Sequence, residues 1–114
     1  MLPQQVPAVD ATELPPDAVL LDVREDDEWA AGHIDGAVHV PMMQLPQRLN
    51  YEPGPITPDR PVVVVCKVGS RSAQVTAWLR HQGYDAVNLA GGLLAWEAAG
   101  RPLATEGDAP GFVL

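Results

Sequence analysis

The chain of 114 residues is long enough for one domain, and its composition, 46% hydrophobic but only 5% aromatic, predicts a core of aliphatic and alanine side chains. A formal net charge of −8 argues against nucleic acid or an anionic membrane as a partner. No apolar run approaches the roughly 20 residues that span a bilayer, and residues 1–5 lack the charged and apolar regions of a secretion signal. With a single cysteine no internal disulfide can form, so we expect a cytoplasmic protein with a free thiol.

Apolar runs and turn residues alternate along the chain at intervals that predict short strands and short helices. The predicted strands cover residues 6–9, 19–23, 37–40, 62–65 and 86–89, and the predicted helices cover residues 25–31, 43–49, 72–82 and 93–99. This alternation predicts an α/β fold, a parallel sheet flanked by helices on both faces. We expect one domain over residues 1–114, with a core over about 5–102 and a C-terminal tail over 103–114. Residues 105–114 show little pattern and predict poor order.

The only cysteine, Cys66, follows four consecutive valines and precedes a predicted helix. Gly69 allows a tight turn, and Ser72 is expected to cap the start of that helix. Loop amides and a helix N-terminus both stabilise a thiolate or another anion. The only lysine, Lys67, and one of the six arginines, Arg71, lie in the same loop, so positive charge gathers beside the candidate nucleophile.

Three stretches of the sequence match a known family in order and spacing. They are Leu20-Leu21-Asp22-Val23-Arg24-Glu25 with Glu28-Trp29, Gly32-His33-Ile34-Asp35-Gly36-Ala37 and Val40-Pro41; the loop from Cys66 to Ser72; and Asn88-Leu89-Ala90-Gly91-Gly92 with Ala95-Trp96. Over most of residues 5–102 the chain closely resembles single-domain rhodanese-like sulfurtransferases. The resemblance implies the α/β rhodanese fold and a cysteine, here Cys66, that carries sulfane sulfur as a persulfide. It also implies a cradle of backbone amides over the loop residues Lys67, Val68, Gly69, Ser70 and Arg71.

The activity that this resemblance implies is transfer of sulfane sulfur from a small anionic donor such as thiosulfate to a thiophilic acceptor. A Cys66 thiolate takes the outer sulfur of the donor and passes it on, with ping-pong kinetics. No second cysteine exists to resolve the persulfide, so the acceptor is external: cyanide, a thiol or an acceptor protein. Lys67 and Arg71 add charge that draws an anionic donor. No cofactor is expected, and no metal site either, because His39 and His81 have no partner pattern.

Two other functions remain open. One is a sulfur-relay or protein-docking rhodanese module that holds the persulfide for a partner and turns over small donors poorly. The other is a cysteine phosphatase or arsenate reductase on the related fold. Four residues separate Cys66 from Arg71, whereas the loop of cysteine phosphatases has five. A shorter ring fits one sulfur atom better than a tetrahedral phosphate, so the loop disfavours the second alternative.

Other conspicuous residues are expected to have structural roles. Asp22 and Arg24 predict a charge pair at a strand end, with Glu25 or Glu28 as candidate neighbours. His33 is expected to brace a turn. The acidic run 25–28 is interpreted as a solvated helix start, since acidic residues favour the first turn of a helix.

Overall fold

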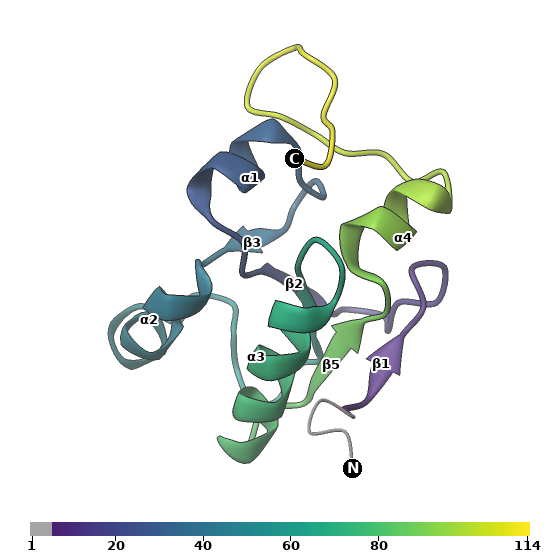
Figure 1. Ribbon diagram of the computed structural model, residues 1–114. Helices are drawn as coiled ribbons and strands as arrows, with labels where there is room; N and C mark the ends of the chain where they lie inside the picture. The colour runs from purple at the N-terminus through teal and green to yellow at the C-terminus, as the bar shows by residue number, and fades with distance from the viewer. Residues whose placement is uncertain (1–5) are drawn as a thin grey trace.

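The structure, a computed structural model, describes residues 6–114 (Figure 1). The expectation about a secretion signal in residues 1–5 falls outside the described residues. The strands are β1 (Ala8–Val9), β2 (Val19–Asp22), β3 (Val38–His39), β4 (Val62–Val65) and β5 (Ala86–Leu89). The helices are α1 (Asp26–Ala31), the 3₁₀ helix η1 (Met42–Gln44), α2 (Leu45–Tyr51), α3 (Ser70–His81) and α4 (Gly92–Ala98). Each predicted strand and helix is present, within a few residues of its predicted bounds.

The five strands of the described chain form one parallel sheet in the order β1-β5-β4-β2-β3. Strand β4 lies at its centre and pairs along its whole length with β2, from Val19↔Val62 to Asp22↔Val65. A parallel strand buried on both faces needs a continuous apolar run, and the four valines of β4 supply it. All four are fully buried.

Helices cover both faces of the sheet, as the alternation of elements predicts. Val62 and Val64 belong to a core cluster with residues of α2 and α3. Val63 and Val65 point to the opposite layer and pack with Leu93 and Trp96 of α4. Burying one such aliphatic side chain stabilises the fold by about 1.5–3 kcal/mol, so the paired layers hold β4 and the loop that follows it in place.

Helix α3 begins two residues earlier than the sequence predicts. Its N-cap is Gly69, whose φ of 102° is in the left-handed region, and Ser70 is its first residue. Ser72 therefore lies within the first turn and is not the cap, which corrects the prediction. The physical reason is that the Cys66 sulfur accepts the Ser72 amide and so takes the place of a capping side chain.

The C-terminal tail, residues 103–114, contacts the rest of the chain at two points. Ala104 pairs with His33 in an isolated antiparallel bridge. The amide of Phe112 donates to the carbonyl oxygen of Ala31 at 2.9 Å. Figure 1 shows the chain end beside α1. Such single contacts between distant residues leave no periodic pattern in the sequence.

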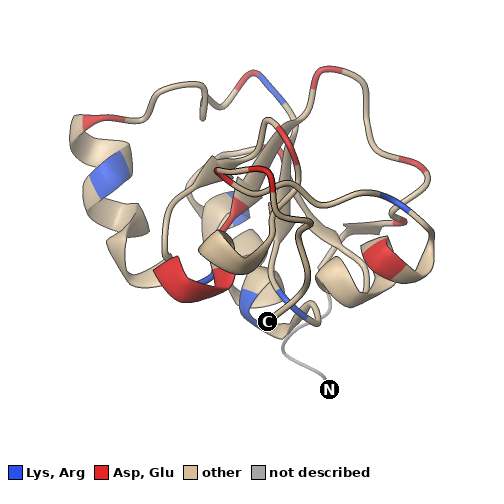
Figure 2. Cartoon of the chain, turned by 90° about the horizontal axis from the view of Figure 1, so that it is seen from above, with Lys and Arg blue, Asp and Glu red and all other residues tan. Residues whose placement is uncertain are grey.

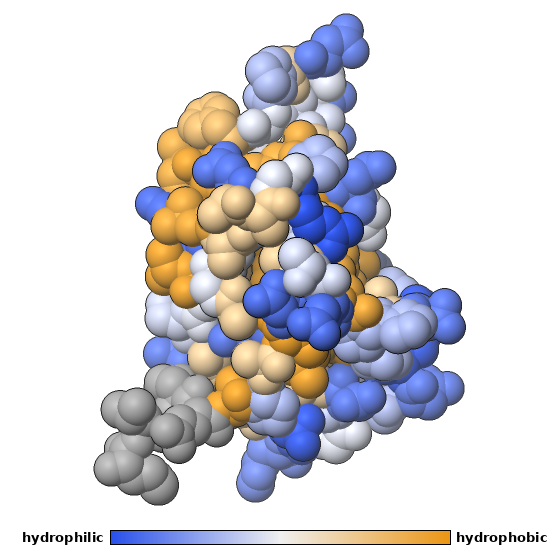
Figure 3. Space-filling view, turned by 90° about the vertical axis from the view of Figure 1, so that its right-hand side faces the viewer, coloured by the Kyte–Doolittle hydropathy of each residue, from blue (hydrophilic) through white to orange (hydrophobic). Residues whose placement is uncertain are grey.

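The surface mixes apolar and hydrophilic residues, as the face in Figure 3 shows. The large hydrophobic residues exposed in the described chain are Met43, Tyr51, Val68, Leu94, Phe112 and Leu114. Within residues 6–114, no helix combines the length and the apolar character that crossing a membrane requires.

Candidate active site

Cys66 is the first residue after β4, at the carboxyl end of the central strand. Ligand sites of parallel sheets lie at this edge, where the loops leave the strands. The residue is 0% exposed and belongs to the core cluster of β2, β4 and α3. The predicted nucleophile thus lies at the base of the Cys66 loop, residues 66–71, and not on its outer surface.

Three hydrogen-bonding groups surround the sulfur. The Gly69 amide donates to Sγ at 3.1 Å, the Ser72 amide at 3.4 Å, and the Ser72 hydroxyl lies 3.2 Å away. Among the described residues, the amides of Val68, Ser70 and Arg71 find no acceptor. N–H groups at the start of a helix have no intrahelical partner, so these amides remain available to an anion in the loop.

Asn88 of β5 fixes the direction of this network. Its side-chain amide donates to the Gly69 carbonyl at 3.1 Å, so its oxygen faces Ser72. The Ser72 hydroxyl donates to that oxygen at 2.5 Å. With its proton committed to Asn88, the Ser72 oxygen accepts from the Cys66 thiol when the thiol is protonated.

The start of α4 supports the Cys66 loop from the side. The amides of Leu93 and Leu94 donate to the carbonyl oxygens of Cys66 and Lys67 at 2.9 and 3.1 Å. This contact requires glycine at position 92, because a Cβ there would lie 2.5 Å from both carbonyl oxygens. The φ of Gly92 is +62°, in the left-handed region that glycine adopts without strain.

Arg71 forms a bidentate ion pair with Glu28 of α1. Its two terminal nitrogens donate to Glu28 Oε1 and Oε2 at 2.7 and 2.9 Å. The hydrogen bonds from Arg71 hold the pKa of Glu28 at about 2, below its ordinary value of 4.5. The prediction that residues 25–28 form a solvated helix start is therefore wrong for Glu28, whose carboxylate pairs with Arg71 of the Cys66 loop. Lys67, the other cation of the loop, is partly exposed and forms no ion pair with a described residue.

Arg24 is a buried brace, as its structural interpretation predicts. It is 0% exposed, and its Nη2 donates to the Asp22 carboxylate at 2.8 Å and to the Gly32 carbonyl at 2.7 Å. Its Nη1 donates to the carbonyl of Glu28 at 3.1 Å. A buried charge needs such complete pairing, and here the pairing fixes α1 to the end of β2.

His33 and His39 both stack on the Trp29 ring, with ring centroids 3.7 and 4.7 Å from its own. Nδ1 of His33 donates to the Trp29 carbonyl at 2.8 Å, which confirms its turn-bracing role. Nε2 of His39 donates to the Arg24 carbonyl at 2.8 Å. The stack stiffens α1, the helix that carries Glu28.

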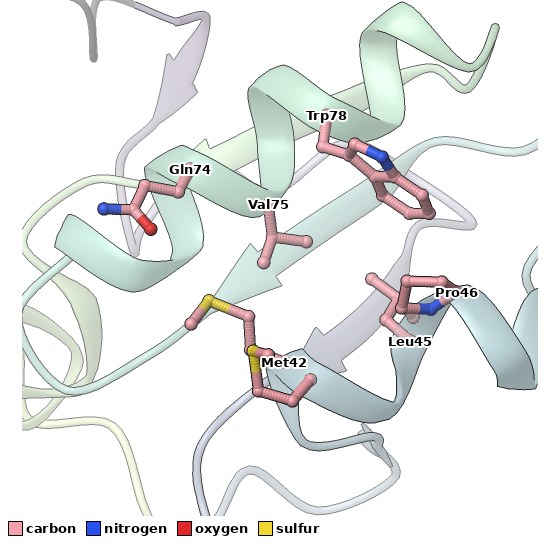
Figure 4. Close-up of a pocket in the computed structure, with 7 residues that line it drawn as sticks. Met42, Leu45, Pro46, Gln74, Val75 and Trp78 are labelled. Carbon is pink, nitrogen blue, oxygen red and sulfur yellow. The ribbon is translucent and has the colours of Figure 1, made fainter.

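An apolar groove of about 270 Å³ lies between α3 and the η1–α2 segment. Figure 4 shows Val75 and Trp78 of α3 facing Leu45 and Pro46 of α2, with Met42 close by. Met42 and Val75 pack in the core cluster that contains Cys66. The groove is thus connected to the site through packed side chains.

The sequence places Cys66 and its loop cations together, and the structure adds three residues to them. Ser72 is present in the loop motif, but the sequence assigns it a cap. Asn88 and Glu28 are part of the family motifs, but their positions in the sequence do not indicate a role at the site. Only the sheet register and the position of α1 bring these two side chains to the loop.

The comparison with known proteins places this geometry in a family. A model of the rhodanese-like domain matches residues 9–99. The putative sulfurtransferase YtwF of Bacillus subtilis is 40% identical over 83 residues, which are 73% of this chain and 77% of that protein. A sulfurtransferase of Allochromatium vinosum is 43% identical over 93 residues, 80% of this chain and 83% of that protein.

A solved structure agrees with the sequence comparison. The thiosulfate sulfurtransferase of Pseudomonas aeruginosa matches with a TM-score of 0.76 and 28% identity, over 97% of this chain and 22% of that chain. The family model covers most of the chain, and two relatives exceed 30% identity over more than two thirds of it. The chain therefore belongs to the family of rhodanese-like domains.

Proposed function

We propose that the chain is a sulfurtransferase that moves sulfane sulfur from a donor such as thiosulfate to a thiophilic acceptor through a persulfide on Cys66. The observation that carries the proposal is the Cys66 sulfur at the base of a loop, bonded to two amides and beside three amides that have no acceptor among residues 6–114. Convergent N–H groups of this kind stabilise negative charge as it develops on sulfur. The family and the names of its relatives support sulfur transfer in general.

Each half of the proposed reaction balances without a cofactor. The Cys66 thiolate attacks the outer sulfur of thiosulfate, a new S–S bond forms, and sulfite leaves with the electron pair of the broken bond. A nucleophilic acceptor then takes the terminal sulfur and releases the Cys66 thiolate. Because Cys66 is the only cysteine, the acceptor is a separate molecule: cyanide, a thiol or a protein.

The test is intact mass after incubation with thiosulfate. The wild-type chain is expected to gain one sulfur atom and to lose it on addition of cyanide. The Cys66→Ser variant is expected to fold, because the substitution is nearly isosteric, and to gain no sulfur. A serine variant that still forms thiocyanate at a comparable rate would overturn the assignment of Cys66.

Burial of the sulfur favours a second candidate, a sulfur-relay module with little turnover of small donors. Cys66 is 0% exposed, so a small donor reaches the sulfur only through the loop. A relay module is expected to form the persulfide once and to release it slowly to cyanide. Steady turnover with thiosulfate and cyanide would favour the enzyme, whereas a single loading event would favour the relay.

A further inference from the structure

The Glu28 carboxylate forms an ion pair with Arg71, the arginine of the Cys66 loop. Both terminal nitrogens of Arg71 donate to it, and its side chain is 16% exposed. Its own helix fixes its position, because Glu28 Oε1 also accepts the Glu25 amide at 3.1 Å in a capping box. The Glu28 backbone is fixed as well, because Arg24 Nη1 donates to its carbonyl oxygen. An anion that used Arg71 would first have to displace a carboxylate that accepts both Arg71 nitrogens and the Glu25 amide.

The remaining charge near the loop gives an incoming dianion little attraction. The ion pair with Glu28 offsets the charge of Arg71. Lys67 is then the loop cation that forms no ion pair with a described residue. Helix α1 adds the exposed carboxylates of Asp26 and Asp27. Acidic residues outnumber basic ones over the whole chain, which carries −8 (Figure 2). The electrostatic repulsion energy of a −2 ion in this field is about twice that of a −1 ion at the same place.

The loop also presents an apolar side chain that suits an organic group. Val68, in the loop itself, is 51% exposed. The lining of the apolar groove includes Met42 and Val75, which pack in the same cluster as Cys66. An alkyl group on a donor would therefore contact the Val68 side chain, whereas a further anionic oxygen would find both terminal nitrogens of Arg71 paired with Glu28.

We propose that Glu28 is a positioning residue that withholds Arg71 from the donor and so selects singly charged organic sulfane-sulfur donors over the thiosulfate dianion. The proposal rests on the proposed function. With a thiosulfonate, the Cys66 thiolate attacks the outer sulfur and forms the persulfide bond. The bond to the sulfonyl sulfur breaks, and an organic sulfinate leaves with its electron pair. No oxidant or reductant enters the step.

Two probes of similar size separate charge from shape: thiosulfate, with two charges, and methanethiosulfonate, with one. In Glu28→Gln the thiosulfate KM is expected to fall about tenfold, since Arg71 becomes available, while the methanethiosulfonate KM falls no more than about threefold. The values of kcat change little for either probe. The glutamine oxygen can still accept the Glu25 amide, so the capping box is kept.

Asp26→Asn is the matched control, because it removes one negative charge from the same helix at a carboxylate that does not contact Arg71. Its two KM values are expected to change by less than about twofold. The double variant Glu28→Gln/Arg71→Gln is expected to lose the gain with thiosulfate. These results together would show that Glu28 acts through Arg71.

An unchanged ratio of the two KM values in Glu28→Gln, or an equal shift in Asp26→Asn, would overturn the proposal. Intact mass of the wild-type chain with methanethiosulfonate separates this failure from that of the proposed function. Normal loading of one sulfur on Cys66 with an unchanged ratio rejects only the role of Glu28. No loading from either probe rejects the sulfurtransferase assignment and the role of Glu28 with it.

Discussion

The Ser72 hydroxyl has one proton and two neighbours that can accept it, Asn88 Oδ1 and the Cys66 sulfur. With a neutral thiol, the proton lies toward Asn88 and the sulfur donates to the serine oxygen. A charge-assisted hydrogen bond is roughly twice as strong as a neutral one, so an anionic sulfur competes for the same proton. Ser72 can thus follow the charge on sulfur by rotating one O–H bond.

Ser72→Ala is expected to slow loading of Cys66 and to destabilise the fold. The variant removes the hydroxyl from sulfur and leaves the buried Asn88 oxygen without its donor, which costs about 1–3 kcal/mol. The rate of sulfur gain by mass spectrometry and the free energy of unfolding in urea measure the two effects.

Thr76→Val is the control for Ser72→Ala. The Thr76 hydroxyl donates to the Ser72 carbonyl at 2.7 Å, on the same buried face of α3, and does not contact the sulfur. This variant is expected to lose about 1 kcal/mol of stability and to load sulfur at the wild-type rate. Equal loading rates in Ser72→Ala and the wild type would contradict the role of the hydroxyl.

Two helix starts meet at the Cys66 loop. Each of α3 and α4 follows a glycine with positive φ, Gly69 at 102° and Gly91 at 72°. The first amides of α4 hold the carbonyl oxygens of the loop, while the first amides of α3 face the sulfur or have no acceptor in the described part of the chain. The backbone of the loop is therefore held through its oxygens, and its N–H groups are left for an anion.

Gly92→Ala is expected to destabilise the fold by more than about 3 kcal/mol and to abolish sulfur loading, because strain and a backbone collision coincide. Its Cβ would lie 2.5 Å from the carbonyl oxygens of Cys66 and Lys67. The midpoint of thermal unfolding and the mass gain with thiosulfate measure the outcome.

Gly100→Ala separates strain from collision. Gly100 also has positive φ, +78°, but a Cβ there would meet no atom within 4 Å. Its expected cost is about 1–2 kcal/mol from the left-handed conformation alone, with normal loading. Similar losses in the two variants would show that the contact between α4 and the loop is unimportant.

The ion pair between α1 and α3 makes the stability of the whole molecule depend on pH. The pKa of Glu28 is lowered from 4.5 to about 2 in the folded chain, mainly by hydrogen bonds from Arg71. A depressed pKa contributes stability that is complete above the unfolded value and is lost as the pH falls through the folded value. The contribution is therefore lost between pH 4.5 and about 2.

Urea unfolding of the wild type and Glu28→Gln over this pH range tests the prediction. The difference between their free energies of unfolding is expected to be constant above pH 4.5 and to shrink as the pH approaches 2. A difference that stays constant down to pH 2 would show that the ion pair contributes no pH-dependent stability.

The sequence predicts the layers of this molecule better than its long-range contacts. The valines of β4 and the turn at Gly91-Gly92 carry local patterns, so the sheet and the strand-to-helix junctions follow from them. The position of Cys66 at a strand end follows in the same way. Glu28 meets Arg71 across 43 positions of sequence, and Phe112 returns to α1 by one backbone bond. Neither contact has a periodicity, so neither could be predicted.

Both edge strands of the sheet are too short to pair well with a strand of another chain. The outer strands β1 and β3 contain two residues each, with Pro7 before one and Pro41 after the other. Unpaired edge strands are the usual template for aggregation, and short edges next to proline offer few free N–H and C=O groups to a neighbour. Even at high concentration, copies of this molecule are therefore not expected to pair sheet edge to sheet edge. The carboxyl ends of the strands, where Cys66 lies, then stay accessible to other molecules.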